Sequence, residues 1–453
     1  MRPLKLPEGA RFSNKDIFVF LLPILFEQLM VAFLGMADTF VVSFLGETAV
    51  AGVALVNRID NFAKQFFIAL AQGGSVVLSQ YIGAGDRKNS EKSLRENIRI
   101  VVLIGVMVML VMVLFKKQVL TGLFGGAEPD VLKISGEYFT VTAFSYPFVA
   151  LYYSGTSNLR AMGESRIPFI STVVMMSLNI ALKYLFIFKM DMGVSGAAVS
   201  TIVSMGLVGF VLMLMMKNPH NKVRLSGLLK PDLNLDISKR ILTVSVPNGI
   251  EQGMFQLGAL MIAGLVSGLG TAAIAADSIA RTCSTFVHCA GTGCSTVMMM
   301  VIGQCMGAKK PDEAKFYTKH ILKIDYIMTI AVSALFIAFM PAIISVFKKG
   351  ASPEAQTLAY QILLIYTLGS CVFYPTSFAV ASALRATGDT KFVMMVSVLS
   401  MFLFRIGAAY IFVNVLKLGV IGTWVAMVSD WVIRSAVFII RFIHGKWQKN
   451  KVI

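Results

Sequence analysis

Several acidic side chains lie inside long apolar runs of the sequence, among them Asp38, within the stretch FLGMADTFVVSFLG, and Glu27 and Glu251. A carboxylate among Phe, Leu and Val costs several kcal/mol unless it is paired, protonated or hydrated. Acids in such places indicate a site for a proton, a metal cation or a positively charged ligand, or an ion pair that stabilises the fold. The elements that carry them decide between these alternatives.

The composition is that of a membrane protein. The chain has 453 residues, of which 56% are hydrophobic and 14% charged, and its mean hydropathy is +0.75. Apolar runs of about 20 residues, the length that crosses a bilayer as a helix, recur along it, whereas the alternating pattern of a membrane β-barrel is absent. We therefore predict an all-α integral membrane fold with twelve transmembrane helices, at residues 17–44, 47–82, 96–115, 131–158, 167–188, 193–216, 241–268, 271–306, 321–347, 355–384, 392–415 and 418–440.

The distribution of basic residues predicts the topology. The formal net charge is +17, and 27 Lys and Arg residues fall in one alternate set of loops and ends, against seven in the other. By the positive-inside rule both termini are cytoplasmic. Because topology accounts for these charges, we predict no nucleic-acid partner.

The two halves of the chain repeat one another. The segment PILFEQLMVAFLGMADTFVVSFLG from Pro23 aligns with PNGIEQGMFQLGALMIAGLVSGLG from Pro247 at an offset of 224 residues, and LRAMGESR at Leu159 aligns with LRATGDTK at Leu384 at 225. We predict an N-terminal six-helix lobe over 1–216, a cytoplasmic connecting loop over 217–240 and a C-terminal six-helix lobe over 241–453. Two such lobes can open a central cleft to either side in turn, as in secondary transporters.

These segments, together with the loop SQYIGAGD at Ser79, resemble the multidrug and toxic compound extrusion (MATE) transporters over nearly the whole chain, and in detail the bacterial DinF-like branch. The resemblance implies a V-shaped pair of six-helix lobes. It also implies export of amphipathic, often cationic drugs or xenobiotics in exchange for protons or sodium ions, across the inner (cytoplasmic) membrane of a bacterium.

Three residues are carried over from the family by position. Asp38 matches the acid of the first helix at which the coupling cation acts, with Na⁺ as one candidate ion, and Asn179 matches an asparagine of the same cation network. Pro23 matches the proline at which the first helix bends. The chain departs from the family at Lys183, because DinF-like members often carry an acid four residues after that asparagine.

Asp38 and Lys183 are predicted to lie at similar depths in the membrane. Asp38 is 22 residues after Asp16, and Lys183 is 17 after Arg166, which places them roughly 33 Å and 26 Å from the cytoplasmic ends of their helices. If the two side chains meet, Lys183 holds the carboxylate ionised and acts as a built-in cation that a proton or substrate must displace. A static ion pair is the structural alternative.

Four further residues are candidates for a substrate cavity. Glu27 and Glu251 each lie 11 residues into their helices, near the bilayer midplane, where they could attract cationic cargo or could be paired inside the bundle. His288, which the repeat aligns with Lys64, could titrate or be an interior residue. Arg405, in the middle of a span, could counter an acid of the cleft or be structural.

Acid–base pairs spaced i,i+4 within spans are expected to be structural. They are Asp60 with Lys64, Asp277 with Arg281, and Asp430 with Arg434.

The leading hypothesis is a secondary antiporter for organic cations or other xenobiotics. An alternative in the same superfamily is a flippase for lipid-linked sugars, which needs a strongly basic cavity, or an exporter of one metabolite. A membrane enzyme is disfavoured because the sequence has no catalytic constellation or metal-ligand cluster, and it has no P-loop for ATP. We predict a monomer in the lipid bilayer with no cofactor and no bound metal other than the coupling ion, H⁺ or Na⁺.

Overall fold

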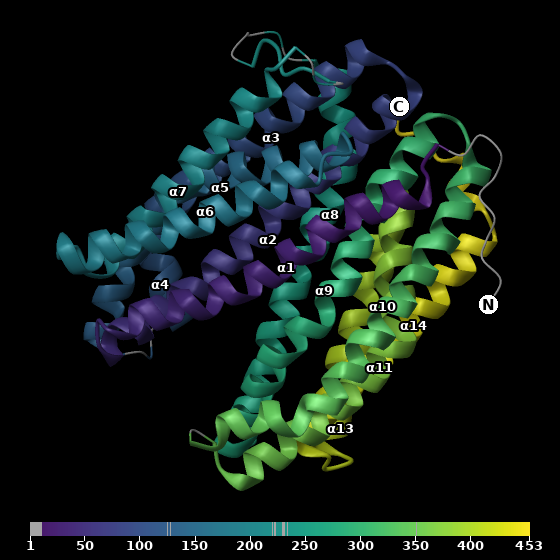
Figure 1. The fold of residues 1–453 in the computed structure, drawn as a ribbon. Coiled ribbons are helices and arrows are strands. Elements are labelled where there is room, and N and C mark those ends of the chain that lie inside the picture. Colours follow the sequence, from purple (N-terminus) through teal and green to yellow (C-terminus); the bar gives the residue numbers. More distant parts are fainter. Residues whose placement is uncertain are drawn as a thin grey trace. The chain divides into compact units, whose positions relative to one another are not determined.

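The computed structural model describes residues 11–124, 126, 128–219, 221, 223–228, 232, 234–349 and 351–453. Within these ranges it does not describe the side chains of residues 32–40, 42, 43, 47, 348 and 349. The described residues form helices and short connections (Figure 1). This agrees with the all-α fold predicted from the sequence.

Most of the helices follow one another with short turns, whereas residues 217–234 connect α7 to α8. The first seven are α1 (Asn14–Ser43), α2 (Glu47–Ala84), α3 (Arg87–Leu114), α4 (Lys116–Phe124), α5 (Pro129–Ala161), α6 (Arg166–Tyr184) and α7 (Gly193–Met216). The others are α8 (Leu235–Ser267), α9 (Thr271–Gly307), α10 (Pro311–Ser345), α11 (Pro353–Ala386), α12 (Thr390–Ser400), α13 (Ala408–Asn414) and α14 (Gly419–Ile443). Two π-helical segments, η1 (Leu185–Lys189) and η3 (Met401–Gly407), continue α6 and join α12 to α13, and two short 3₁₀ turns are η2 (Val346–Lys349) and η4 (Lys446–Lys449).

Each of the twelve predicted spans coincides with one helix or with consecutive helical segments. Within the described part of the chain, nine helical segments are long and apolar enough to cross a membrane. Helices α3 and α10 begin nine and ten residues before the predicted spans. The side chain of Asp86 accepts a hydrogen bond from the backbone N–H of Asn89 at 3.0 Å, and Pro311 begins α10. Such N-terminal signals let a helix continue into polar sequence beyond its apolar run.

The helices form two compact units whose boundaries differ from the predicted lobes. Unit 1 contains residues 1–28 and 250–452, and unit 2 contains residues 29–249 and 453. The first half of α1 therefore belongs with the C-terminal helices, and the first half of α8 with the N-terminal ones. The sequence repeat could not show this, because packing, and not chain order, decides where a long helix belongs.

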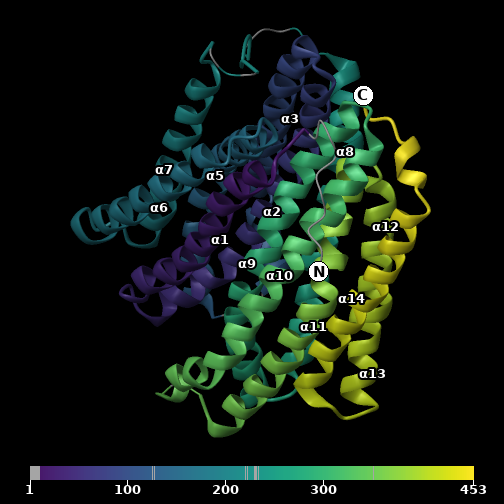
Figure 2. The same cartoon turned by 45° about the vertical axis from the view of Figure 1, so that its right-hand side comes forward.

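Unit 1 holds the first half of α1 through apolar and polar contacts. Ile17 and Leu21 are buried in one cluster with Met298 of α9. At the start of α1 the backbone N–H of Phe12 donates to the hydroxyl of Tyr317 at 2.8 Å. Helices α9, α10, α11 and α14 run alongside one another in this unit (Figure 2).

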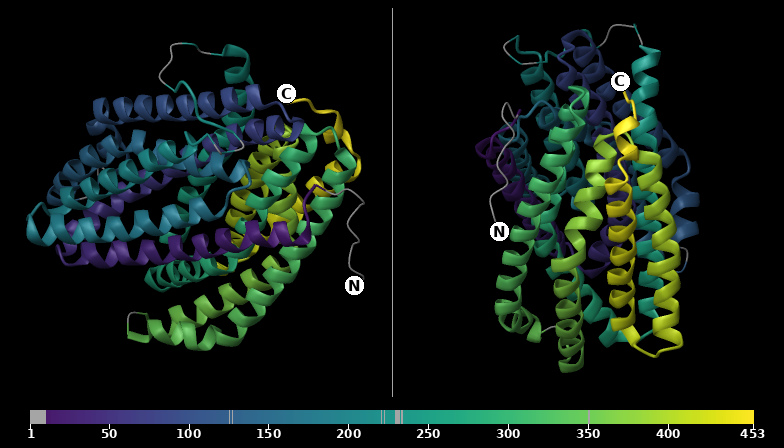
Figure 3. Two further views of the ribbon diagram at one scale, coloured as in Figure 1. Left: turned by 45° about the horizontal axis from the view of Figure 1, so that its top comes forward. Right: turned by 90° about the vertical axis from the view of Figure 1, so that its right-hand side faces the viewer.

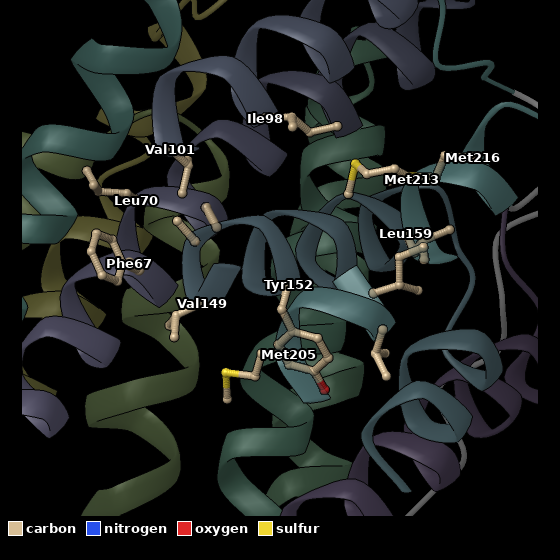
Figure 4. Packing of buried hydrophobic residues seen from close by; sticks show 14 of the residues in the cluster. Phe67, Leu70, Ile98, Val101, Val149, Tyr152, Leu159, Met205, Met213 and Met216 are labelled. Atoms are coloured by element: carbon tan, nitrogen blue, oxygen red, sulfur yellow. The ribbon is translucent and has the colours of Figure 1, made fainter. Parts of the chain in front are cut away.

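Unit 2 is built around an apolar core contributed by α2, α3, α5 and α7. Figure 4 shows Phe67 and Leu70 of α2, Val149 of α5 and Met205 of α7 in this core. The first half of α8 joins it where the hydroxyl of Ser245 donates to the carbonyl of Leu70 at 2.9 Å.

The contact between α2 and α8 depends on Gly73. A Cβ at this position would lie 2.5 Å from the Cα of Ser245 and 2.8 Å from its backbone nitrogen. Small residues at such points let two helix backbones approach closely. Since backbone atoms cannot move aside cheaply, Gly73→Ala is expected to lower the free energy of unfolding by about 1–3 kcal/mol.

Thermal unfolding in detergent checks this prediction. Gly122→Ala is the matched control, because a Cβ at Gly122 meets no atom within 4 Å and Ala favours the helix by about 0.4–1 kcal/mol. Equal midpoints for Gly73→Ala and the native protein would contradict the close-approach argument.

The internal repeat is present in the backbone. Gly46 and Gly270, 224 residues apart, have φ angles of 93° and 96°, and Gly193 and Gly419, 226 apart, both have 56°. The turn between α13 and α14, which leads into Gly419, is the yellow loop near the lower end of the right-hand view in Figure 3. Turns that need a left-handed residue therefore recur at equivalent places in the two halves.

Candidate functional site

A cavity of about 80 Å³ lies inside unit 2, between α2, α5, α6 and α7. This volume suits a small ion with a few waters, not a drug-sized ligand. Its charged lining residues are Asp60, Lys64 and Lys183. Its polar neutral lining residues are Asn57, Tyr138, Thr142, Ser145 and Thr201.

One wall of the cavity is an ion pair on α2. The Nζ of Lys64 lies 2.6 Å from an Oδ of Asp60, one helical turn earlier. The predicted i,i+4 pair is therefore confirmed. Because the pair borders the cavity, it is part of the candidate site as well as part of the fold, which the sequence spacing alone does not reveal.

A second wall of the cavity includes Lys183 on α6, and Asn179 on the same helix contacts Thr201, which also lines the cavity. The side-chain amide of Asn179 donates to the hydroxyls of Thr201 and Ser204 on α7, at 3.3 and 3.0 Å. Lys183 follows one turn later, so both side chains lie on the same face of the helix. Both are buried. The structure thus brings two of the three predicted coupling residues to one place.

The third coupling residue, Asp38, is in α1, but its side chain lies outside those that the structure describes. Its approach to Lys183 therefore stays a prediction. Pro23 lies inside α1, five residues before the unit boundary between Gln28 and Leu29. Proline removes one backbone hydrogen bond from a helix and favours a bend, and the bending role of Pro23 also stays a prediction.

The midplane acid Glu251 is paired inside unit 1. An Nη of Arg385 on α11 lies 2.6 Å from an Oε of Glu251, which is 1% exposed. Glu251 is thus paired inside the helix bundle, which is the structural one of the two alternatives that the sequence left open. Glu27 is also buried in unit 1.

His288 is packed among aromatic rings in unit 1. Its ring stacks on Tyr374 at a centroid distance of 4.6 Å and an interplanar angle of 24°, and it lies 5.4 Å from Tyr366 and 6.2 Å from Trp431. The rings come from α9, α11 and α14. His288 is thus positioned as an interior residue of this cluster.

Arg405 occupies the place in unit 1 that corresponds to Asn179 in unit 2. The offset of 226 residues aligns Asn179 with Arg405 and Thr201 with Met427. Asn179 donates to Thr201, and an Nη of Arg405 lies 3.0 Å from the sulfur of Met427. The same helix-to-helix contact is therefore made by an uncharged pair in one half and by a guanidinium in the other.

The predicted pair between Asp430 and Arg434 is wrong, whereas Arg281 and Asp277 do pair, at 2.6 Å. Asp430 accepts a hydrogen bond from the hydroxyl of Ser400. Arg434 is fully buried, and its guanidinium lies over three phenylalanine rings, at 4.7 Å from Phe378, for example. Aromatic faces attract a cation, and this packing turns the side chain away from the acid.

Sequence reasoning missed the neutral part of the cavity wall. Asn57, Tyr138 and Thr201 are ordinary residues for a polar stripe within a span, and no spacing distinguishes them from other hydroxyls and amides. The structure links Thr201 to the candidate site through its hydrogen bond with Asn179. Asn179 itself could be found from the sequence, because the family resemblance singles it out.

Comparison with known protein families supports the repeat. The family model MatE matches residues 23–185 and again residues 247–411. The two matched segments are the two halves of the internal repeat, and together they cover well over half of the chain.

Similar proteins cover the chain from end to end. The "Probable multidrug resistance protein NorM" of Thermotoga maritima is 26% identical over 449 residues, covering 97% of this chain and 94% of that protein. The "Uncharacterized transporter YisQ" of Bacillus subtilis is 25% identical over 457 residues, covering 98% and 96%.

A solved structure described as the outward-facing conformation of a multidrug resistance MATE family transporter of the MOP superfamily has a TM-score of 0.90 at 20% identity, covering 99% of this chain and 100% of that one. A MOP superfamily transporter from Pyrococcus furiosus, described as having a binding pocket of reverse polarity, has a TM-score of 0.88 at 21% identity, covering 99% of this chain and 100% of that one.

These likenesses confirm the predicted twelve-helix fold. The comparisons name no branch, so the DinF-like assignment stays a prediction. With both halves matched by the family model, the chain is a multi-pass membrane transporter and belongs to the MatE family, the multidrug and toxic compound extrusion transporters.

Proposed function

We propose that the protein is a secondary antiporter that exports amphipathic, often cationic compounds in exchange for protons or sodium ions. The observation that carries the proposal is the cavity inside unit 2, which Asp60, Lys64 and Lys183 line from helices long and apolar enough to cross a membrane. The names of the relatives, which include multidrug resistance proteins, support the cargo class.

The physical argument rests on the cost of these charges. Ionisable side chains in the bilayer are expensive and are retained where they bind or move ions. An ion that binds one conformation better than the other shifts the balance between them. In this proposal Asp38 holds the coupling cation, Asn179 and Lys183 shape its site, and the transported compound binds elsewhere, because the cavity is too small for it.

Uptake into proteoliposomes tests the proposal. Purified protein is reconstituted, and accumulation of ethidium, an organic cation, is followed under a proton gradient and, separately, under a sodium gradient. Accumulation driven by one gradient and abolished when that gradient is collapsed is expected. Accumulation that responds to neither gradient would contradict ion-coupled export of this cargo and favour the flippase or the metabolite exporter.

The direction of export depends on the topology. The distribution of basic residues predicts that both termini are cytoplasmic. In a variant without its five cysteines, a cysteine introduced at Ser352 should react with an impermeant maleimide in intact cells. One introduced at Asn221 should react only after the membrane is opened. The reverse pattern would contradict the predicted orientation.

A further inference from the structure

Unit 1 contains a buried acid that none of the roles above uses. Asp325 on α10 is 0% exposed. It lies 14 residues after the start of the helix at Pro311, which corresponds to about 21 Å along its axis. In the sequence, Asp325 lies only four residues after the predicted start of its span at residue 321, so its depth in the fold is not apparent from its position.

The contacts of Asp325 are all with uncharged groups. The hydroxyl of Thr329 donates to one carboxyl oxygen at 3.2 Å, and the other oxygen, Oδ2, has no hydrogen-bond partner. No ion pair among the described residues includes Asp325. Compare Glu251 in the same unit, which is equally buried but has Arg385 at 2.6 Å.

Among the residues that the structure describes, the helices packed against α10 supply two weak acids near this carboxyl. They are the thiol of Cys294 on α9 and the phenol of Tyr374 on α11. Cys294, Ile321 and Ile324 are buried in the apolar cluster around it. Neither the thiol nor the phenol can serve as a counter-ion, since each is neutral when protonated and negative when not.

Burying a lone carboxylate is far more costly than burying a neutral carboxylic acid. With no cation beside it among the described side chains, Asp325 is best accommodated in this packing with a proton on the carboxyl. A conformation that admitted water or a cation would favour the ionised form. Asp325 can therefore take up and release a proton when the packing of unit 1 changes.

We propose that Asp325 is a proton-binding site of the transport cycle, protonated while unit 1 is packed as observed. When its surroundings open, the carboxylic acid gives its proton to water and becomes a carboxylate, and it regains a proton before the packing closes again. The link between Asp325 and export depends on the antiport function proposed above. The proton chemistry of Asp325 can be tested separately.

Infrared spectroscopy of the full-length protein in liposomes provides the first test. A protonated carboxyl has a C=O stretch well separated from that of a carboxylate, and deuteration shifts it. Wild type minus Asp325→Asn should show one such band, which should shift in D₂O within minutes and disappear as the pH is raised. Glu354→Gln, at an exposed acid of α11, should remove no such band.

The absence of the Asp325 band would overturn the proposal, because the group would then be ionised as packed. A band that does not exchange with D₂O, or that stays constant across the pH series, would overturn it too, since it would belong to a static acid. These readouts need no substrate, so they remain informative if gradient-driven export of ethidium fails.

Export gives the second test. Asp325→Asn should reduce proton-driven ethidium accumulation by at least tenfold, whereas Thr329→Val, which removes only the hydrogen-bond donor, should reduce it by less than threefold. Normal, pH-independent accumulation in Asp325→Asn with correctly folded protein would show that the carboxyl plays no part in transport, and the proposal would be abandoned.

Discussion

Asp38→Asn is expected to abolish gradient-driven export while leaving the binding of cargo nearly unchanged. An antiporter works only if ion occupancy changes the free-energy difference between its two conformations. Moving a two-state balance from 1:99 to 99:1 takes about 5.5 kcal/mol of differential binding. The amide of Asn is close in shape to the carboxylate but cannot change its charge, so this contribution is lost and accumulation should fall by about two orders of magnitude.

The measurement is ethidium accumulation in proteoliposomes, with ethidium binding to the detergent-solubilised protein measured in parallel. Asp191→Asn is the matched control in the same unit, because Asp191 is exposed and has a positive φ of 51° that Asn also tolerates. Accumulation at the wild-type rate in Asp38→Asn would rule out Asp38 as the coupling acid. Loss of both accumulation and binding would indicate a damaged fold instead.

The second large effect concerns the stability of unit 1. Glu251→Gln is expected to lower the free energy of unfolding by about 3–5 kcal/mol, because it leaves the guanidinium of Arg385, whose side chain is 13% exposed, without its carboxylate. The double variant with Arg385→Gln should recover most of this loss, since no unpaired charge remains.

Chemical denaturation in mixed micelles measures these differences. Glu313→Gln is the control, because the Lys310 partner of Glu313 is 51% exposed and exposed pairs contribute about 1 kcal/mol or less. If the ion pair is structural, export per folded molecule should fall by the same factor for a permanently charged cation and for a neutral compound. A selective loss for the cation would show instead that Glu251 contacts the cargo.

Much of the fold is determined by the sequence alone. Apolar runs of membrane-spanning length correspond to the observed helices, and the turns with left-handed glycines recur at the predicted offsets, as at Gly46 and Gly270. These features are local: helix length follows from bilayer thickness, and a tight turn follows from the residue that can adopt it. Local spacing also predicted the pair of Asp60 and Lys64.

Only the tertiary structure decided which charges meet. Spacing predicted the same pairing for Asp430 and Arg434 as for Asp60 and Lys64, yet Asp430 bonds to Ser400 of another helix and Arg434 packs on phenylalanine rings. The partner of Glu251 is 134 residues away in the sequence. Asp325 has no ion-pair partner among the described residues, which only the packing of its neighbours reveals. A charged side chain on one helix can pair with groups on several neighbouring helices, so spacing along its own helix does not decide its partner. Once the pair is buried, separating it leaves an unpaired charge in the interior, which is costly. The same packing assigns the first half of α1 to unit 1, since a helix about 45 Å long buries its two ends in different surroundings.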